Sequence, residues 1–531
     1  MNPLSPGARR FRCAIAVAIA IWLLLRLVYW NGYYTEDSPG YVTDAIWAAL
    51  GQYPVRTYVN GLNVGTDLPV ALPIALFGKS EAALSLWPLA CSLLGLLSIA
   101  TAARIFFGRM AGAVAAFLYA TYPGDVFFST VVMPDAVQSG WIAASIALVS
   151  LGYAASPRRK GSLIIGAGMA LGICHLARAT DVLLVPVGLA AVVLCAIQWA
   201  RVRWTAALRD AAEFAAGWAS IVIAETAVYW QATGDPLLRL RVLQGNYGSP
   251  QSIARAGLNI DPRTIPFSLF APVEWWLHGG WWTLSPEQAY HGLLFCLAVV
   301  GLVVVLVAAA RCGSPDRRAK AGAAVAAVWL AWPILYHQFG TESLTAFVPM
   351  HRLSRQLVVY APGAILCVAA GSAFAARALP SASAYRRFAA AAAIVAAVFI
   401  LGFNWAGTRI AYRNYHAIKD TYARIRAHLP PDTSTIVADP GDLCFFDFWM
   451  NPLGSVRVRT IPFDAVGRCA DMPPGIVLTH SNPGWTAGAP AIQTAVRRLP
   501  CLEHPPGNWE LLYQGYPERV FRIPSADHVG N

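Results

Sequence analysis

The dominant feature of this chain is a series of apolar stretches, each close to the length that crosses a lipid bilayer. A helix needs about 20 predominantly apolar residues to span the hydrocarbon core. Such stretches cover residues 12–30, 81–107, 110–124, 135–153, 161–177, 180–199, 211–230, 291–310, 321–337, 356–377 and 388–409. Only 13% of the residues are charged, whereas about 25% are charged in a soluble domain. We therefore predict an all-α polytopic membrane protein with about eleven transmembrane helices.

Short basic segments separate these stretches and indicate their orientation. With Arg9–Arg12 placed inside, each predicted inside loop is basic, as the positive-inside rule requires. These loops are 104–109, 157–160, 201–209, 311–320 and 377–387. The net charge of +12 is thus explained without a nucleic-acid partner, which we do not expect. The residues predict a bacterial inner-membrane, multi-pass protein with a retained first helix and a cytoplasmic N-terminus.

One further apolar stretch, Leu68–Gly78, is too short to span a bilayer and contains two prolines. Counting it as a span would place the basic segment 157–160 outside, so we predict an interfacial or re-entrant piece. The outer segments then include a first loop at 31–80 and a long loop at 231–290.

The polar tail forms a second predicted domain. We divide the chain into a transmembrane module, 1–410, and a small extracytoplasmic C-terminal α/β domain, 411–531. Alternating apolar residues at Thr435–Ala438 and Arg519–Ile523 are typical of strands. The tail contains Cys444, Cys469 and Cys501, which allow one disulfide of open pairing if the tail is extracytoplasmic.

Ionisable side chains from distant parts of the sequence meet on the predicted outer face. Carboxylates suit a general base or a divalent cation, and arginines suit a phosphate because they bind it through two N–H groups. The candidates are Glu36, Asp37, Asp135, His175, Arg178, Arg352 and Arg355. Two charged residues inside spans, Arg26 and Glu225, require a partner or a water-filled cavity.

Seven short motifs follow in a fixed order over residues 1–240. They are Glu36-Asp37-Ser38-Pro39-Gly40-Tyr41, Leu72–Gly78, Ala103–Arg109, Tyr122-Pro123, Met133-Pro134-Asp135-Ala136, His175–Thr180 and Thr233–Leu237. In this order and spacing the chain resembles the GT-C superfamily of glycosyltransferases that use polyprenyl-phosphate sugars. The resemblance is to the branch with protein O-mannosyltransferases and lipid A aminoarabinose transferases. The aminoarabinose transferases have a lysine where this chain has Thr66-Asp67, so their substrate is not implied.

The resemblance implies an inverting transfer of a monosaccharide from a polyprenyl-phosphate donor to an envelope glycan, lipid or protein. By this resemblance Asp37 is the general base, with Glu36 as the alternative, and Asp135 orients a substrate or helps to hold a divalent cation. The implied phosphate ligands are Arg178, Arg352 and Arg355, and Tyr41 and His175 complete the substrate-binding set. Membrane lipids are further partners, and a metal requirement is left open.

Two other functions compete with the enzyme. A transporter or flippase of lipid-linked sugars predicts many charges deep within spans and paired broken helices, and the sequence has few of either. A non-catalytic envelope assembly protein predicts that Asp37→Asn is harmless.

Overall fold

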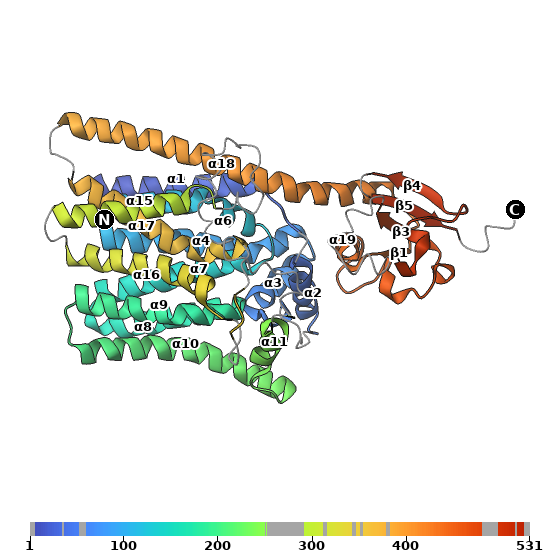
Figure 1. The fold of residues 1–531 in the computed structure, drawn as a ribbon, viewed down its shortest axis with the longest axis horizontal. Helices are drawn as coiled ribbons and strands as arrows, with labels where there is room; N and C mark the ends of the chain where they lie inside the picture. Colours follow the sequence, from blue (N-terminus) through green and yellow to red (C-terminus); the bar gives the residue numbers. More distant parts are fainter. Residues whose placement is uncertain are drawn as a thin grey trace.

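The computed structural model describes residues 6–33, 37–52, 60–249, 251, 291–311, 316–341, 347–350, 354–378, 383–480, 497–515 and 518–524. The described chain consists of a bundle of helices lying side by side and a small sheet domain beyond one end of it (Figure 1). The N-terminus lies at the opposite end of the bundle (Figure 1).

Nine helical segments within the described residues are long and apolar enough to cross a bilayer. The elements that form them are α1 (Pro6–Val28), α4 (Glu81–Phe107), α7 (Pro134–Ala154), α8 (Pro157–Ala177), the continuous η2 (Ala179–Leu184), α9 (Val185–Leu194) and η3 (Cys195–Trp199), α10 (Trp204–Thr233), α16 (Arg317–Phe339), η4 (Ser354–Tyr360) with α17 (Ala361–Ala378), and α18 (Ser383–His428). The predicted all-α polytopic class is confirmed, and the count of eleven spans stays a prediction.

The two remaining predicted spans coincide with shorter helices. The predicted span 110–124 coincides with α5 (Arg109–Thr121), and the short α6 (Pro123–Phe128) follows it. The break falls at Tyr122, because a residue that precedes proline is driven out of the helical region. Tyr122 accordingly has a ψ of 116°. The 13 residues of α5 extend only about 20 Å. The other is α15 (Leu294–Arg311), which has 18 residues.

Small residues let the helices of the bundle approach closely, as is common in membranes. A Cβ added at Gly140 of α7 would lie 2.2 Å from the carbonyl oxygen of Cys91 in α4. A Cβ added at Gly168 of α8 would lie 1.9 Å from the carbonyl oxygen of Phe214 in α10. These backbone contacts fix the positions of α7 and α8, which carry site residues at their ends.

Short elements form a layer over one end of the bundle. They are α2 (Ser38–Ala49), η1 (Asn60–Leu62), α3 (Val64–Phe77) and α11 (Leu238–Tyr247). Figure 1 shows α2, α3 and α11 at the end nearest the sheet domain. The 14 residues of α3 include Pro69 and Pro73 and reach only about 21 Å, which is too short for a span, as the sequence predicted.

The helix α18 is 46 residues long and leads from the bundle to the sheet domain (Figure 1). It passes through the predicted boundary at 410 without a break and ends at His428. The division at 410 therefore remains a prediction, and the sheet itself begins beyond α18.

The sheet domain has five strands in the order β2-β1-β3-β5-β4. The strands are β1 (Thr435–Ala438), β2 (Arg459–Pro462), β3 (Gly475–His480), β4 (Glu510–Gln514) and β5 (Glu518–Ile523), with α19 (Pro440–Met450) between β1 and β2. β1 is parallel to β2 and β3, whereas β5 is antiparallel to β3 and β4. Both strands predicted from alternation are confirmed as β1 and β5.

Short 3-10 turns accompany the sheet: η5 (Phe463–Ala465), η6 (Cys469–Asp471) and η8 (Pro500–Leu502). A disulfide joins Cys469 of η6 to Cys501 of η8. The predicted single disulfide is therefore present, and Cys444 is the remaining thiol.

The sheet domain contacts the bundle through α19. The ring of Tyr33 stacks on Phe448 with 4.3 Å between centroids, and the Tyr33 hydroxyl donates to the Cys444 carbonyl at 3.2 Å. Trp449 Nε1 donates to Glu81 Oε1 at 3.2 Å. These contacts hold the domain beside the end of α1 and the start of α4.

Candidate active site

Asp37 lies just before α2 and is held by an arginine from a distant segment. Pro39 sits in the first turn of the helix, where its missing N–H costs nothing. The Asp37 carboxylate Oδ2 accepts a hydrogen bond from Arg355 Nη2 at 2.5 Å. The Asp37 side chain is 34% exposed and that of Arg355 is 16% exposed. Asp37 is thus an oriented carboxylate that solvent or a substrate can reach.

Asp135 is a buried carboxylate at the first turn of α7. Pro134 begins this helix, whose N-terminal N–H groups favour negative charge. Asp135 is 1% exposed, and its Oδ1 lies 3.7 Å from Arg178 Nη1. Among the described residues, neither Asp135 oxygen accepts a hydrogen bond. Both oxygens therefore keep acceptor capacity for a ligand. Binding such a ligand would offset the cost of burying a charge without hydrogen bonds.

Tyr41 connects the two pairs. Its side chain is 1% exposed. Burial raises the pKa of the Tyr41 hydroxyl above its usual range, and the charge of Asp37 raises it further, while Arg178 and Arg355 oppose the rise. Asp135 also interacts electrostatically with Arg178, Arg355 and Asp37. The structure therefore brings together five of the predicted site residues at one end of the bundle.

His175 belongs to a neighbouring cluster. Its Nε2 lies 3.8 Å from Glu225 Oε2, and Glu225 Oε1 is 2.5 Å from Arg239 Nη1. Glu225 thus has the partner that a charge within a span requires, and this partner is Arg239 in α11. Sequence reasoning missed Arg239 and Asn63, although the alternation Leu238-Arg239-Leu240-Arg241 after a predicted span was a usable signal. Two further predicted residues, Glu36 and Arg352, lie outside the described residues.

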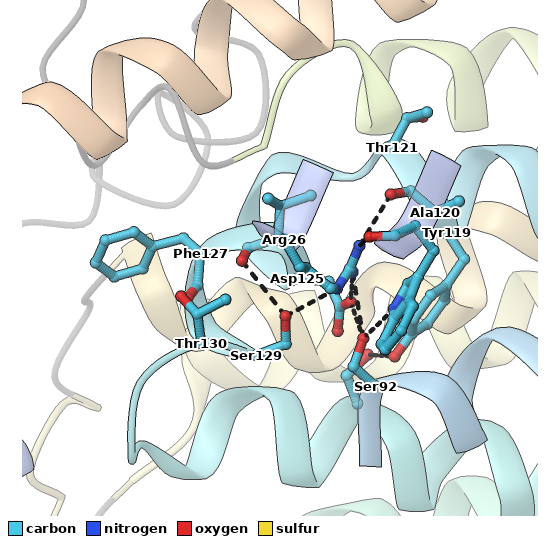
Figure 2. A network of polar contacts seen from close by, with 12 residues as sticks. Arg26, Ser92, Tyr119, Ala120, Thr121, Asp125, Phe127, Ser129 and Thr130 are labelled. Atoms are coloured by element: carbon cyan, nitrogen blue, oxygen red, sulfur yellow. Dashed lines mark hydrogen bonds and ion pairs between the residues drawn. The ribbon is translucent and has the colours of Figure 1, made fainter. Parts of the chain in front are cut away.

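The other charged residue within a span, Arg26, also has a partner. Its guanidinium forms an ion pair with Asp125, and both side chains are almost completely buried. Arg26 also donates to Ser129 Oγ at 2.9 Å and to the Ala120 carbonyl at 3.2 Å. Figure 2 shows this network joining α1 to the residues around α6. The network therefore ties together the segments that precede Asp37 and Asp135.

A small, mainly apolar cavity adjoins Arg178. It measures about 20 Å³ and is lined in part by Gln138, Asp181 and Tyr360, which leaves room for about one water molecule. Gln138 Nε2 donates to both Asp181 oxygens, at 2.8 and 2.9 Å. The cavity is therefore too small for a sugar, and the Gln138–Asp181 contact is a local polar feature of its lining.

The described residues contain no cluster of three or more metal-ligating side chains. Asp135 has free acceptor oxygens, as a hard cation requires, but Asp37 faces Arg355. A divalent cation therefore stays a prediction.

Comparison with known proteins identifies the architecture. Residues 65–230 match the family model described as dolichyl-phosphate-mannose-protein mannosyltransferase. This region includes Asp135 and Arg178 but not Asp37 or Arg355. No curated protein matches the chain.

Solved structures resemble the chain over nearly its whole length. The oligosaccharyltransferase of Archaeoglobus fulgidus, solved with a tethered acceptor peptide, has a TM-score of 0.52 and 13% identity, covering 97% of this chain and 74% of that one. ArnT from Cupriavidus metallidurans bound to undecaprenyl phosphate has a TM-score of 0.47 and 15% identity, with coverage of 96% and 98%.

These features define a multi-pass membrane protein with two carboxylate–arginine pairs at one end of its bundle. The chain has the GT-C fold, and the match over residues 65–230 confirms the predicted resemblance to the GT-C superfamily of glycosyltransferases.

Proposed function

We propose that this protein transfers a monosaccharide from a polyprenyl-phosphate donor to a hydroxyl of an envelope glycan, lipid or protein. The observation that carries the proposal is the reachable Asp37 carboxylate, held 2.5 Å from Arg355, beside the buried Asp135–Arg178 pair. The mannosyltransferase family matched by residues 65–230 is named for a polyprenyl-phosphate sugar. That name supports the same class of donor here.

The proposed reaction is a single inverting displacement. The Asp37 carboxylate accepts the proton of the acceptor hydroxyl as its oxygen attacks the anomeric carbon. The new carbon–oxygen bond forms while the bond from that carbon to the phosphate oxygen breaks. The electron pair of the broken bond leaves with the lipid phosphate. Glu36 is the alternative base.

The arginines stabilise the charge that grows on the leaving phosphate. A cation fixed in a water-poor site stabilises developing charge without reorganising. Arg178 and Arg355 provide two such cations, and Arg352 is a third candidate. Asp135 has oxygens available to orient a hydroxyl of the sugar or the acceptor.

The proposed location is the outer face of a bacterial inner membrane. The N-terminus is cytoplasmic because the basic loops lie on its side of the bundle. The sheet domain then lies outside the cytoplasm. Its disulfide between Cys469 and Cys501 fits this location, because disulfides persist in oxidising compartments and are reduced in the cytosol.

The decisive experiment compares Asp37→Asn with Glu36→Gln in the purified full-length protein. Transfer is measured from a radiolabelled polyprenyl-phosphate sugar to envelope extracts, and envelope glycans are analysed in the corresponding strains. We expect Asp37→Asn to lose transfer by at least about 100-fold, because it removes the general base. Wild-type transfer by this variant would exclude Asp37 as the base, and loss only in Glu36→Gln would assign the role to Glu36.

Two controls separate the rival functions. A flippase moves the intact lipid-linked sugar, so it would change its sidedness in vesicles without forming a glycosidic bond. A non-catalytic assembly protein would tolerate Asp37→Asn in the glycan analysis. Treatment with EDTA, followed by Mg²⁺ or Mn²⁺, tests the divalent cation.

A further inference from the structure

Asn63 makes a buried contact with the Tyr41 hydroxyl. Asn63 follows η1, is 4% exposed, and its Nδ2 donates to Tyr41 Oη at 3.0 Å. Tyr41 is itself surrounded by the charges of Asp37, Arg178 and Arg355. Asn63 is therefore one hydrogen bond away from the candidate active site, although no sequence motif singled it out.

The orientation of the Asn63 amide is determined by its other neighbour. Arg239 Nη2 donates to Asn63 Oδ1 at 3.3 Å, and a guanidinium has no acceptor atom. The oxygen of the amide must therefore face Arg239, which leaves the NH₂ group facing Tyr41. Because Asn63 donates to the Tyr41 oxygen, the proton of the Tyr41 hydroxyl must point to a different acceptor.

Arg239 is fixed in turn by α10. Its Nη1 lies 2.5 Å from Glu225 Oε1, and Tyr229 Oη donates to the same oxygen at 3.2 Å. The Arg239 side chain is 9% exposed, and that of Glu225 is 6% exposed. The arginine therefore has one orientation, and the hydrogen bonds run from it through Asn63 to Tyr41.

We infer that Arg239 and Asn63 are positioning residues that make the Tyr41 hydroxyl a hydrogen-bond donor to an anionic oxygen of the active site. The inference rests on the proposed function. Hydrogen bonds in a chain polarise one another in a low-dielectric interior, so the guanidinium at its start strengthens the donor at its end. The anionic oxygen belongs either to the Asp37 carboxylate or to the phosphate of the donor.

The variant Asn63→Asp tests this arrangement because it keeps the shape of the side chain and reverses its hydrogen bonding. A carboxylate at position 63 has no N–H and accepts the Tyr41 proton, which removes that proton from the active site. We expect Asn63→Asp and Tyr41→Phe each to lower kcat by about tenfold, the typical effect of one charge-assisted hydrogen bond. The double variant should lose no more than the worse single variant, because both changes remove the same donor.

A matched control measures the general effect of burying a carboxylate. Asn404 of α18 is also 4% exposed and donates to a hydroxyl, Thr121 Oγ1, at 3.3 Å, but it is not part of the site. Asn404→Asp should lower thermal stability and leave kcat unchanged. Stability is measured for every variant, so that kcat is compared only for folded protein.

The source of the anionic oxygen follows from the kinetics. If it is Asp37, loss of the donor moves the acidic limb of the pH–rate profile to higher pH; if it is the phosphate, KM for the lipid donor rises. Additive losses in the double variant, or full kcat in Asn63→Asp while Asp37→Asn is inactive, would overturn the inference alone. Full transfer by Asp37→Asn would instead overturn the assignment of Asp37 on which it rests.

Discussion

Arg355 Nη2 lies 2.5 Å from Asp37 Oδ2 although 318 positions separate the two residues in the sequence. The contact joins the segment after α1 to the segment before α17. The general base and a phosphate ligand of the proposed reaction are thus positioned by the same ion pair. The site is therefore assembled only when both ends of the transmembrane module are in place.

The first prediction concerns this pair. Arg355→Ala should reduce transfer by about 100-fold, the effect expected when a donor that stabilises transition-state charge is lost. Arg355→Lys keeps the charge but not the planar fork, so we expect partial activity. Steady-state kinetics on both variants provide the measurement. Arg209→Ala is the control because that arginine is 81% exposed, and an Arg355→Ala variant with wild-type kcat would disprove the role.

A second prediction addresses the network in Figure 2. Asp125→Asn leaves the buried Arg26 without its counter-charge, which typically costs about 3–5 kcal/mol. Thermal unfolding in detergent should therefore occur at a clearly lower temperature. Glu213→Gln breaks an exposed i,i+4 pair with Arg209 and should change stability by no more than about 0.5 kcal/mol. Equal melting temperatures for the two variants would contradict a stabilising role for the network.

Helix packing gives a third prediction with a control on the same helix. Gly168→Ala places a methyl group 1.9 Å from the Phe214 carbonyl oxygen, so α8 and α10 must separate. We expect a loss of about 1–3 kcal/mol or more, read from thermal unfolding. In Gly166→Ala the new methyl is 3.8 Å from Leu148 Cδ1, and stability should be unchanged or higher. The reverse order would refute the packing.

The fourth prediction uses Cys444, the thiol of the sheet domain that is outside the disulfide. Partial burial and, to a smaller extent, nearby carboxylates raise the pKa of Cys444 to about 11. Since the thiolate is the reactive form, little of it exists at pH 8, and the fraction grows as the pH rises toward the pKa. Alkylation mapped by mass spectrometry should be slow at pH 8 and about tenfold faster at pH 9. After reduction, Cys469 and Cys501 should also become labelled; rapid labelling of Cys444 at pH 8 in the folded protein would contradict its raised pKa.

Much of the fold could be predicted from hydrophobicity. The apolar stretches and basic loops give the membrane class, and alternation predicts β1 and β5. The end of the predicted span at 124 lies close to the end of α5 at Thr121, where Pro123 breaks the helix. The helix α6 was missed because its 6 residues are too few to give a hydropathy signal.

The candidate site was predicted in part. The motifs identified Asp37 and Asp135, and Arg178 and Arg355 were selected because arginines in outer loops suit a phosphate. The pairing of Asp37 with Arg355 rather than with Arg178 depends on the three-dimensional packing. Asn63 could not be recognised because an isolated amide has no periodicity or charge, and its importance comes from the neighbours that packing provides.

The contact between the two loops that precede the carboxylates has one more consequence. The Gly32 N–H donates to the Thr130 carbonyl at 3.2 Å. Asp37 lies five residues after Gly32, and Asp135 lies five residues after Thr130. The two segments that lead from this hydrogen bond to the carboxylates, here called the arms, therefore have the same number of residues. Inserting one residue into either arm changes its reach by up to about 3.5 Å, while catalysis tolerates displacements of only about 1 Å. Natural variation in these arms should accordingly alter their side chains and preserve their length.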